Sequence, residues 1–139
     1  MTKKINKRSD CPISCSLDIW GDKWSLLIIR NLMFKNMHTY GEFLKTPEKI
    51  ATNILADRLT SLEHAGLISK VEHSESKAKF FYTLTQKGID LLPVMVEITL
   101  WGNKYFEISQ EAKAIVRHAK HDKEGLINSF SAQLKKLRA

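Results

Sequence analysis

The residues that most directly suggest a chemical role lie between Ile50 and Gly66, in a segment with the pattern of a helix. Leu55, Leu59 and Leu62 recur at spacings of four and three, which predicts a buried stripe. The opposite face would then carry small and polar side chains: Thr52, Asn53, Ala56, Asp57 and Thr60. Asn can pair bidentately with adenine, and Thr can contact a phosphate or a thymine methyl group. This face therefore predicts contact with the major groove of a DNA duplex.

Charged residues around this helix bear on the same interpretation. Lys45 and Lys49 flank the turn before it, where they would lie close to phosphates. Arg58 is placed to reach a phosphate or to pair with an acidic group. Asp57 is unfavourable beside a phosphate, so it would either orient Arg58 or accept a hydrogen bond from cytosine. The alternative for the helix taken alone is an ordinary amphipathic surface helix.

Two short apolar segments that follow Gly66 predict a β-hairpin. Residues 68–72 and 80–84 have the composition of strands, and the seven residues between them, HSESKAK, are too many for a tight turn. We expect these seven residues to form a projecting wing. Lys77 and Lys79 alternate along it, so both can point to one side and contact phosphates. The alternative is a solvated charged tip, which Glu72 and Glu75 also fit.

The order of the expected elements defines a fold. Residues 40–44 predict a brief helix that stops at Thr46-Pro47. The helix that begins at Thr52 or Asn53, the two strands and a helix capped by Thr85 follow in turn. Helix, turn, helix, strand, wing and strand form the pattern of a winged helix-turn-helix, which usually binds DNA.

Further helices are expected on both sides of this module. Pro12 suits the first turn of a helix to Trp20, Gly21 ends it, and Asp22 can cap an almost wholly apolar helix over residues 23–35. The helix that begins after Thr85 contains Pro93, which predicts a bend. Residues 110–137 predict a last helix that Gly125 divides. The fold class is thus mainly α with a small β-hairpin wing, a winged helix-turn-helix with extra C-terminal helices.

The length and charge limit the organisation of the chain. Its 139 residues, 43% of them hydrophobic, suffice for one packed domain. We expect a flexible basic arm over 1–10, a DNA-binding and dimerisation domain over 11–108 and a C-terminal helical extension over 109–139. The net charge of +7 comes from the two ends, because residues 9–108 are nearly neutral. DNA binding by the centre must therefore depend on local patches. The chain shows no apolar run of membrane-spanning length and no signal peptide, which predicts a cytoplasmic protein.

Two thiols lie near the start of the first expected helix. Cys11 immediately precedes Pro12, and the unpaired N–H groups of a helix N-terminus favour a reactive thiolate. Cys15 is one turn further along and should be more buried. A disulfide between positions i and i+4 of one helix has poor geometry. A bond to another molecule, or an adduct with a small electrophile or oxidant, is the expected chemistry of Cys11, and the alternative is a pair of incidental thiols.

The sequence offers little for other kinds of chemistry. The motifs of a phosphate-binding loop, a dinucleotide-binding turn and a zinc protease are missing. His118 and His121 lie three apart on the last helix, but no ligand cluster accompanies them, so solvent-exposed histidines are the simpler interpretation. Since no nucleophile, base and orienting acid come together, an enzyme is not expected. We also expect no cofactor and no metal.

Five segments together resemble the HxlR-type winged helix regulators of bacteria. They are CPISCSLDIWGDKWSLLIIRNL (11–32), YGEFLK (40–45), IATNILADRLTSLEHAGLI (50–68), FYTLTQKG (81–88) and LLPVMVEITLWG (91–102). The Cys-Pro start, the Gly-x-Lys-Trp turn and the Leu-x-x-Arg-Leu-x-x-Leu-Glu run are specific in combination. The resemblance covers roughly residues 11–102. Asp57 departs from the commoner uncharged or longer polar side chain, which leaves the base preference open.

The resemblance implies a homodimeric transcription regulator that binds a pseudo-palindromic operator. The dimer would be formed by the N-terminal helix and the long helix after the wing, here residues 12–20 and 85–108. Interface candidates are Ile13, Leu17, Leu92, Val96, Trp101 and Tyr105. Some members sense electrophiles or oxidants through the cysteine before the proline, which is Cys11 here.

Two other functions compete with DNA-binding regulation. A winged helix can serve only as a protein-interaction module, and the nearly neutral centre fits that alternative. The chain can also be a small-molecule-responsive regulator without redox sensing, with a pocket between the C-terminal helices near Trp101 and Phe106. A steep loss of duplex binding with salt would favour DNA contact over the first alternative.

Overall fold

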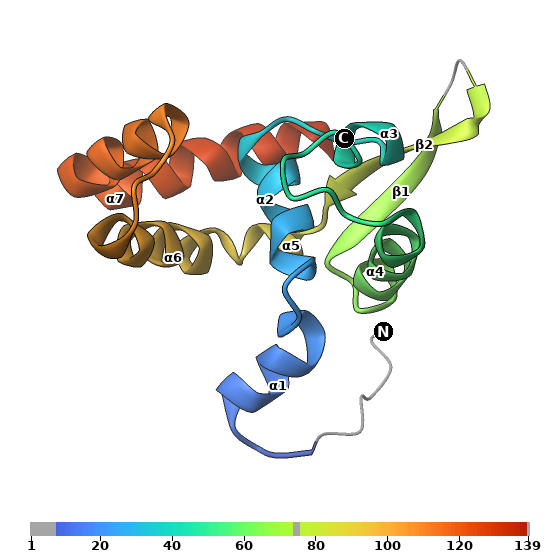
Figure 1. The fold of residues 1–139 in the computed structure, drawn as a ribbon, viewed down its shortest axis with the longest axis horizontal. Coiled ribbons are helices and arrows are strands. Elements are labelled where there is room, and N and C mark those ends of the chain that lie inside the picture. The colour runs from blue at the N-terminus through green and yellow to red at the C-terminus, as the bar shows by residue number, and fades with distance from the viewer. Residues whose placement is uncertain (1–7, 74–75, 139) are drawn as a thin grey trace.

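A computed structural model of the chain describes residues 8–73 and 76–138, except for the side chains of residues 73–79. Its elements are, in order, α1 (Pro12–Trp20), α2 (Ser25–Phe34), α3 (Tyr40–Phe43), α4 (Thr52–His64), β1 (Ile68–His73), β2 (Ser76–Leu84), α5 (Gln86–Ile89), α6 (Leu92–Tyr105) and α7 (Gln110–Leu137). Helices surround a single antiparallel hairpin, with α4 and the hairpin at one side and α6 and α7 at the other (Figure 1). The winged helix-turn-helix fold predicted from the sequence is confirmed.

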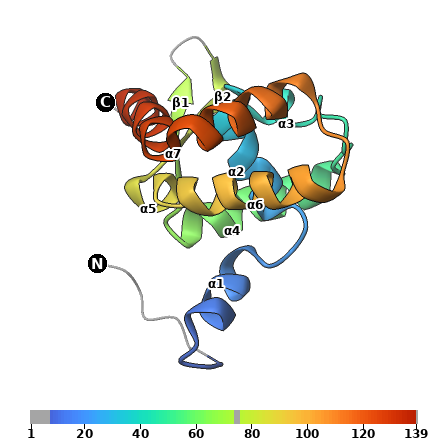
Figure 2. The same cartoon turned by 90° about the vertical axis from the view of Figure 1, so that its left-hand side faces the viewer.

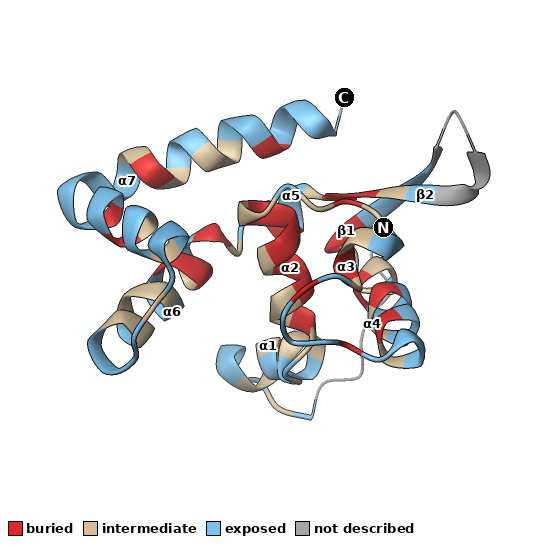
Figure 3. Ribbon diagram, turned by 45° about the horizontal axis from the view of Figure 1, so that its top comes forward, coloured by how far each residue is buried: buried red, intermediate tan, exposed pale blue. Residues whose placement is uncertain are grey.

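The core forms where α2 runs through the middle of the molecule. Ile28, Ile29 and Leu32 on α2 are at most 2% exposed, and they pack with Leu55 of α4 and Leu84 of β2. Figure 3 shows the buried residues concentrated along α2 and the adjoining ends of α4 and the strands. A helix that is apolar on most of its sides can be satisfied only in such a central position.

The helix boundaries follow the capping residues. The Asp22 carboxylate accepts hydrogen bonds from the amides of Trp24 and Ser25, both at 3.0 Å, and so caps α2 as expected. Gly66 ends α4 with φ of 82°, a conformation that a side chain would strain. Thr85 accepts from the Gly88 amide at 3.2 Å at the start of α5.

Three features differ from the sequence expectation. Strand β2 begins at Ser76, not near Phe80, because a ladder of backbone hydrogen bonds continues without apolar side chains. The predicted bend at Pro93 is wrong, since the chain forms two separate helices and Pro93 lies in the first turn of α6, where its missing N–H costs nothing. The break in α7 falls at Asp122, not at Gly125.

Helix α7 folds back over its own subunit. Its interruption at Asp122 is stabilised by a hydrogen bond of 2.9 Å from the Gly125 amide to the Asp122 carboxylate, which caps the second half of the helix. Beyond the break, Phe130 packs edge-on against Phe34 with ring centroids 5.1 Å apart, and Leu134 joins the main core. Figure 2 shows α7 lying across α6 and α2.

Candidate nucleic-acid interface

Helix α4 presents the two faces that its leucine spacing predicts. Leu55, Leu59 and Leu62 are 0%, 3% and 0% exposed, so they turn into the core. The opposite face is exposed and carries the side chains of Thr52, Asn53, Ala56, Asp57 and Thr60. This face lies at the outer edge of the molecule beside the hairpin (Figure 1). No part of the described chain covers it, so it is open to a partner.

The first helix of the pair is built to hold the start of α4. Thr39 and Glu42 form a reciprocal capping box around α3. The Tyr40 hydroxyl then donates to the Thr52 carbonyl at 3.0 Å, which ties α3 to the first residue of α4. Lys45 and Lys49 are both exposed on the connection between the two helices. Lys49 has φ of 56°, and this left-handed conformation turns the chain toward α4.

An ion pair fixes that connection to the central helix. Arg30 of α2 donates to both carboxylate oxygens of Glu48, at 2.7 and 3.0 Å. The hydrogen bonds from Arg30 lower the pKa of Glu48 to about 2, so this carboxylate is charged at neutral pH. A bidentate arginine–carboxylate pair restricts both partners. The loop that carries the two lysines is therefore anchored independently of DNA.

Arg58 is engaged by two carboxylates. Its Nε donates to Asp57 at 3.0 Å and its Nη2 forms a second bond to the same oxygen. Its Nη1 lies 3.5 Å from Asp22. Of the two roles expected for Arg58, the structure shows the pairing with acidic groups. The Asp57 carboxylate orients Arg58, as the sequence suggested.

Asp22 connects this group to the N-terminus of α2. Burial opposes ionisation, but hydrogen bonds from the Ser25 side chain and from the amides of Trp24 and Ser25, together with Arg58, lower the pKa of Asp22. The sequence identified Asp22 as a cap without linking it to α4. A contact across thirty-six positions has no local signature, so sequence reasoning could not find it.

The hairpin is attached to the helix-turn-helix through His38. The Tyr82 amide donates to the His38 carbonyl at 2.7 Å, and His38 Nδ1 lies 2.9 Å from the Tyr82 carbonyl. The imidazole is buried and stacks on Phe81 with centroids 4.6 Å apart. Sequence reasoning treated His38 as an isolated histidine. The side chains of Lys77 and Lys79 lie outside the described residues.

The two cysteines differ in environment. Cys11 is exposed at the N-cap of α1, whereas Cys15 is half-buried, as expected, and its Sγ donates to the Ser9 carbonyl at 3.2 Å. Both are free thiols. Arg8, which was expected to favour a Cys11 thiolate, instead pairs with Asp18 at 2.6 Å.

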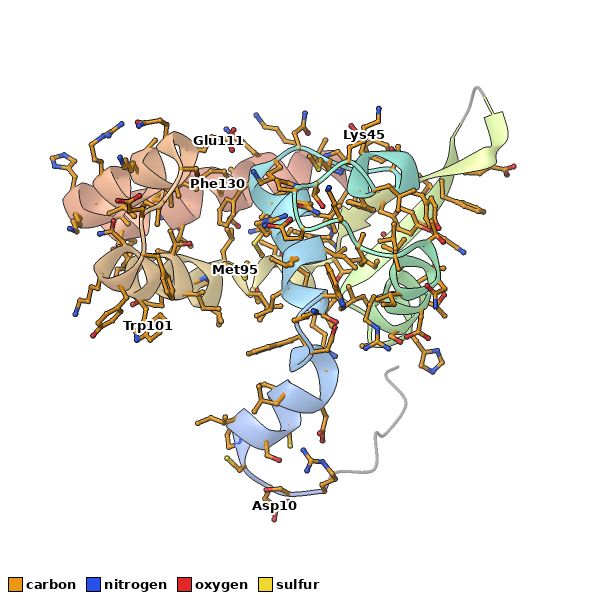
Figure 4. The ribbon with its side chains drawn as sticks, in the orientation of Figure 1. Asp10, Lys45, Met95, Trp101, Glu111 and Phe130 are labelled. Carbon is orange, nitrogen blue, oxygen red and sulfur yellow. The ribbon has the colours of Figure 1, made fainter. Side chains whose placement is uncertain are left out.

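The proposed dimer residues separate into two groups. Leu92 and Val96 are 1% and 0% exposed, because that face of α6 packs inside the subunit, so their assignment to a dimer interface is wrong. The other candidates are exposed, and Ile98 and Phe106, which the candidate set omitted, join them: Ile13, Leu17, Ile98, Trp101, Tyr105 and Phe106. Figure 4 shows Trp101 pointing away from the body of the molecule.

The outward face of α6 is also hollowed. An open apolar depression of about 460 Å³ is lined by Pro93, Val94, Glu97, Ile98 and Trp101. Sequence reasoning missed Ile98 because α6 has apolar residues on two opposite faces, and periodicity alone did not show which face the chain buries.

The described residues show no group of three or more metal-ligating side chains and no helix long and apolar enough to cross a membrane. His118 and His121 are both exposed on α7. These observations leave the exposed face of α4 and the apolar face of α6 as the surfaces to be explained.

Comparison with known proteins identifies the family. Residues 19–110 match the HxlR-like helix-turn-helix family. The uncharacterized HTH-type transcriptional regulator YdeP of Bacillus subtilis is 34% identical over 95 residues, which cover 68% of this chain and 73% of YdeP. The crystal structure of PA1607 is 39% identical, with a TM-score of 0.66 over 75% of this chain and 71% of PA1607.

The redox regulator HypR in its oxidised form is 25% identical, with a TM-score of 0.62 over 70% of this chain and all of HypR. The family match and the structural matches confirm the resemblance that the five sequence segments suggested. The chain belongs to the HxlR-like helix-turn-helix family of transcriptional regulators.

Proposed function

We propose that this protein regulates transcription as a homodimer that places two copies of α4 in successive major grooves of a pseudo-palindromic operator. The observation that carries this proposal is the exposed polar face of α4, with Thr52 and Asn53 in its first turn and Leu55 and Leu59 turned inward. The first turn of a recognition helix is the part that reaches base edges.

Phosphate contacts must come from outside α4. Arg58 is the only lysine or arginine of this helix, and it is paired with Asp57 and Asp22. Lys45 and Lys49 are exposed just before α4, on a loop that the Arg30–Glu48 pair holds in place. These two lysines are therefore proposed to fix the register of α4 on the duplex, while α4 supplies the base contacts.

A second copy of the chain supplies what the monomer lacks. None of the residues of α1 is buried, and one face of α6 exposes Ile98, Trp101 and Tyr105 by 47%, 60% and 66%. Apolar patches of this kind mark interaction sites. Helix α1 extends from the body on the side toward which Trp101 also points (Figure 4). A two-fold interface that joins these elements would set the two recognition helices about 34 Å apart, one turn of the duplex.

Selection of bound sequences from random duplex DNA tests this function. We expect an enriched motif with two-fold symmetry and half-sites about one helical turn apart, and an affinity that falls steeply with salt. Binding with a flat salt dependence, or enrichment of no motif, would contradict the proposal and favour a protein-interaction module.

Regulation by thiol modification at Cys11 completes the proposal. Cys11 is exposed at the start of α1, the helix proposed to join the two subunits, and the matched protein HypR is described as a redox regulator. Modification of Cys11 by a small electrophile or oxidant would change the packing of α1 and hence the placement of the two α4 helices.

The test compares release from the selected operator by a thiol oxidant in the wild type, Cys11→Ser and Cys15→Ser. We expect release to be lost only in Cys11→Ser, because Cys15 is half-buried and its thiol is hydrogen-bonded to Ser9. Unchanged release in Cys11→Ser would contradict redox control and leave a regulator without it.

A further inference from the structure

The three charged residues around α4 form a connected group. Asp22, which caps α2, lies 3.5 Å from Nη1 of Arg58, and Arg58 donates through Nε and Nη2 to Asp57. The side chains of Asp22 and Arg58 are about equally shielded, at 30% and 29% exposed, while that of Asp57 is 63% exposed. The group thus runs from the interior junction of α2 to the outer face of α4.

Arg58 acts inside the protein in this arrangement. Its guanidinium is held by two carboxylates from different elements, which leaves it poorly placed to extend toward a phosphate. An arginine with a planar fork of donors orients a carboxylate more strictly than a lysine would. Because Asp22 is itself held by the amides of Trp24 and Ser25, Arg58 has a fixed support behind it.

Asp57 is the member of the group that faces outward. Both bonds from Arg58 go to its Oδ2, and within the described chain Oδ1 accepts no hydrogen bond. An ionised carboxylate only accepts hydrogen bonds. Asp57 follows Asn53 by one helical turn, so the two side chains lie on the same exposed face. In the major groove, the base-edge donor that a carboxylate matches best is the N4 amino group of cytosine.

The paired arginine also removes an objection to this contact. A lone carboxylate near the phosphates of a duplex is repelled by their charge. Arg58 places a positive charge directly against Asp57, so the pair approaches DNA with little net charge. Its geometry is fixed before binding, which lowers the entropic cost of forming the contact.

We propose that Asp57 is a specificity-determining residue that accepts a hydrogen bond from the N4 amino group of cytosine, and that Arg58, supported by Asp22, is its positioning residue. The inference rests on the proposed entry of α4 into the major groove. A contact from Arg58 to a phosphate, with Asp57 as a mere counter-charge, is the opposing result of the test.

The first experiment repeats the selection from random duplexes with the full chain and its Asp57→Ala, Asp57→Asn and Glu124→Gln forms. Glu124 is exposed on α7, far along the chain from α4, and matches the charge change of Asp57→Asn. We expect cytosine at one symmetry-related position of each half-site for the wild type and Glu124→Gln. The preference should vanish in Asp57→Ala and move toward adenine in Asp57→Asn, since Asn pairs with adenine.

The second experiment changes one atom group of the DNA. N4-methylcytosine keeps its pair with guanine but replaces the N–H in the major groove with a methyl group. We expect this base at the selected position to weaken wild-type binding about tenfold. The same duplex should leave the affinity of Asp57→Ala unchanged.

The third comparison tests the positioning role. Asp22→Asn keeps a side-chain oxygen to cap α2, and Arg58→Lys keeps the positive charge. Both should weaken discrimination against N4-methylcytosine while leaving the salt dependence of binding unchanged. A lower salt slope in Arg58→Lys would instead reveal a phosphate contact and overturn the assignment.

Failures of the two proposals are distinguishable. If the wild type and Glu124→Gln select a symmetric motif in which no preference depends on residue 57, the cytosine contact is wrong and the DNA-binding function stands. If Asp57→Ala tightens binding to all sequences equally, Asp57 is only a counter-charge. If neither the wild type nor Glu124→Gln selects any motif, the proposed function fails and the cytosine contact fails with it.

Discussion

Single charged residues hold the recognition module together by linking helices that are distant in sequence. Arg30 joins α2 to the loop before α4 through Glu48, and Arg58 joins α4 to the start of α2 through Asp22. Both pairs involve partly shielded side chains, so they restrain geometry more than they add stability. They place Lys45 at the outer edge of the helix-turn-helix before any DNA arrives (Figure 4).

The Glu48 pair predicts a specific sensitivity to acid. The pKa of Glu48 falls from 4.5 to about 2 in the folded protein, chiefly through its hydrogen bonds with Arg30. A carboxyl group whose pKa is depressed by folding stabilises the fold above its unfolded pKa, and this contribution is lost as the pH falls from 4.5 towards 2. We expect Glu48→Gln to unfold with a weaker pH dependence in that window, measured by urea denaturation at several pH values. Glu124→Gln, at an exposed site, should retain the wild-type pH profile.

The two lysines before α4 predict a change in salt dependence. If Lys45 and Lys49 each neutralise a phosphate, the slope of log affinity against log salt should fall by about 0.9 for each lysine removed per subunit. Lys45→Ala and Lys49→Ala, tested singly on the selected operator by fluorescence anisotropy, should show this change without altering the selected motif. Lys113→Ala, at an exposed position on α7, is the control. Slopes that match the wild type in both loop variants would show that the phosphates are contacted from elsewhere.

At the scale of elements, the sequence predicted most helices because their ends carry local signals. Gly21, Asp22, Gly66 and Thr85 mark boundaries that the structure confirms. The exposed face of α4 followed from its leucine spacing for the same reason. The pairing of Arg58 with Asp22 and the burial of Val96 depend on which segments meet in space, and no local pattern encodes that.

Helix α6 shows most clearly where periodicity fails. Val96 and Trp101 are both apolar, yet the first is 0% exposed and the second 60%. The difference arises because α7 returns and covers one face of α6, contributing Ala119 and Leu126 to a shared cluster. A prediction from α6 alone could not choose between its faces, so it placed residues from both in one interface.

Helix α7 is expected to contribute to stability through its second half. Leu134 is 6% exposed and belongs to the main core, whereas Leu137, one turn later, is 41% exposed. Leu134→Ala should lower the free energy of unfolding by about 2–4 kcal/mol, because it removes buried methyl groups and leaves a cavity. Leu137→Ala should cost less than about 1 kcal/mol. Urea denaturation followed by circular dichroism compares the two, and equal losses would show that α7 does not share the core.

At the scale of the whole molecule, the subunit is built as half of an assembly. One side carries the polar face of α4 and the hairpin, and the other carries α6 and α7 (Figure 1). Helix α1 and the outward face of α6 expose Ile13, Leu17 and Trp101 to solvent. Joining two copies there would bury these groups and leave both recognition faces free, which a monomer with one short recognition helix needs for discrimination.

Trp101 therefore provides the sharpest test of the assembly. Trp101→Glu should convert a dimer to a monomer in sedimentation at micromolar concentration, because the change places a charge in a desolvated apolar contact. Affinity for the two-fold operator should fall at least tenfold, since each monomer then binds one half-site alone. The far-ultraviolet circular dichroism spectrum should not change, as residue 101 is exposed in the subunit. Leu137→Glu, also at an exposed apolar position but on α7, should remain dimeric. A wild type that sediments as a monomer, or a Trp101→Glu variant that remains a dimer, would show that this face has another partner.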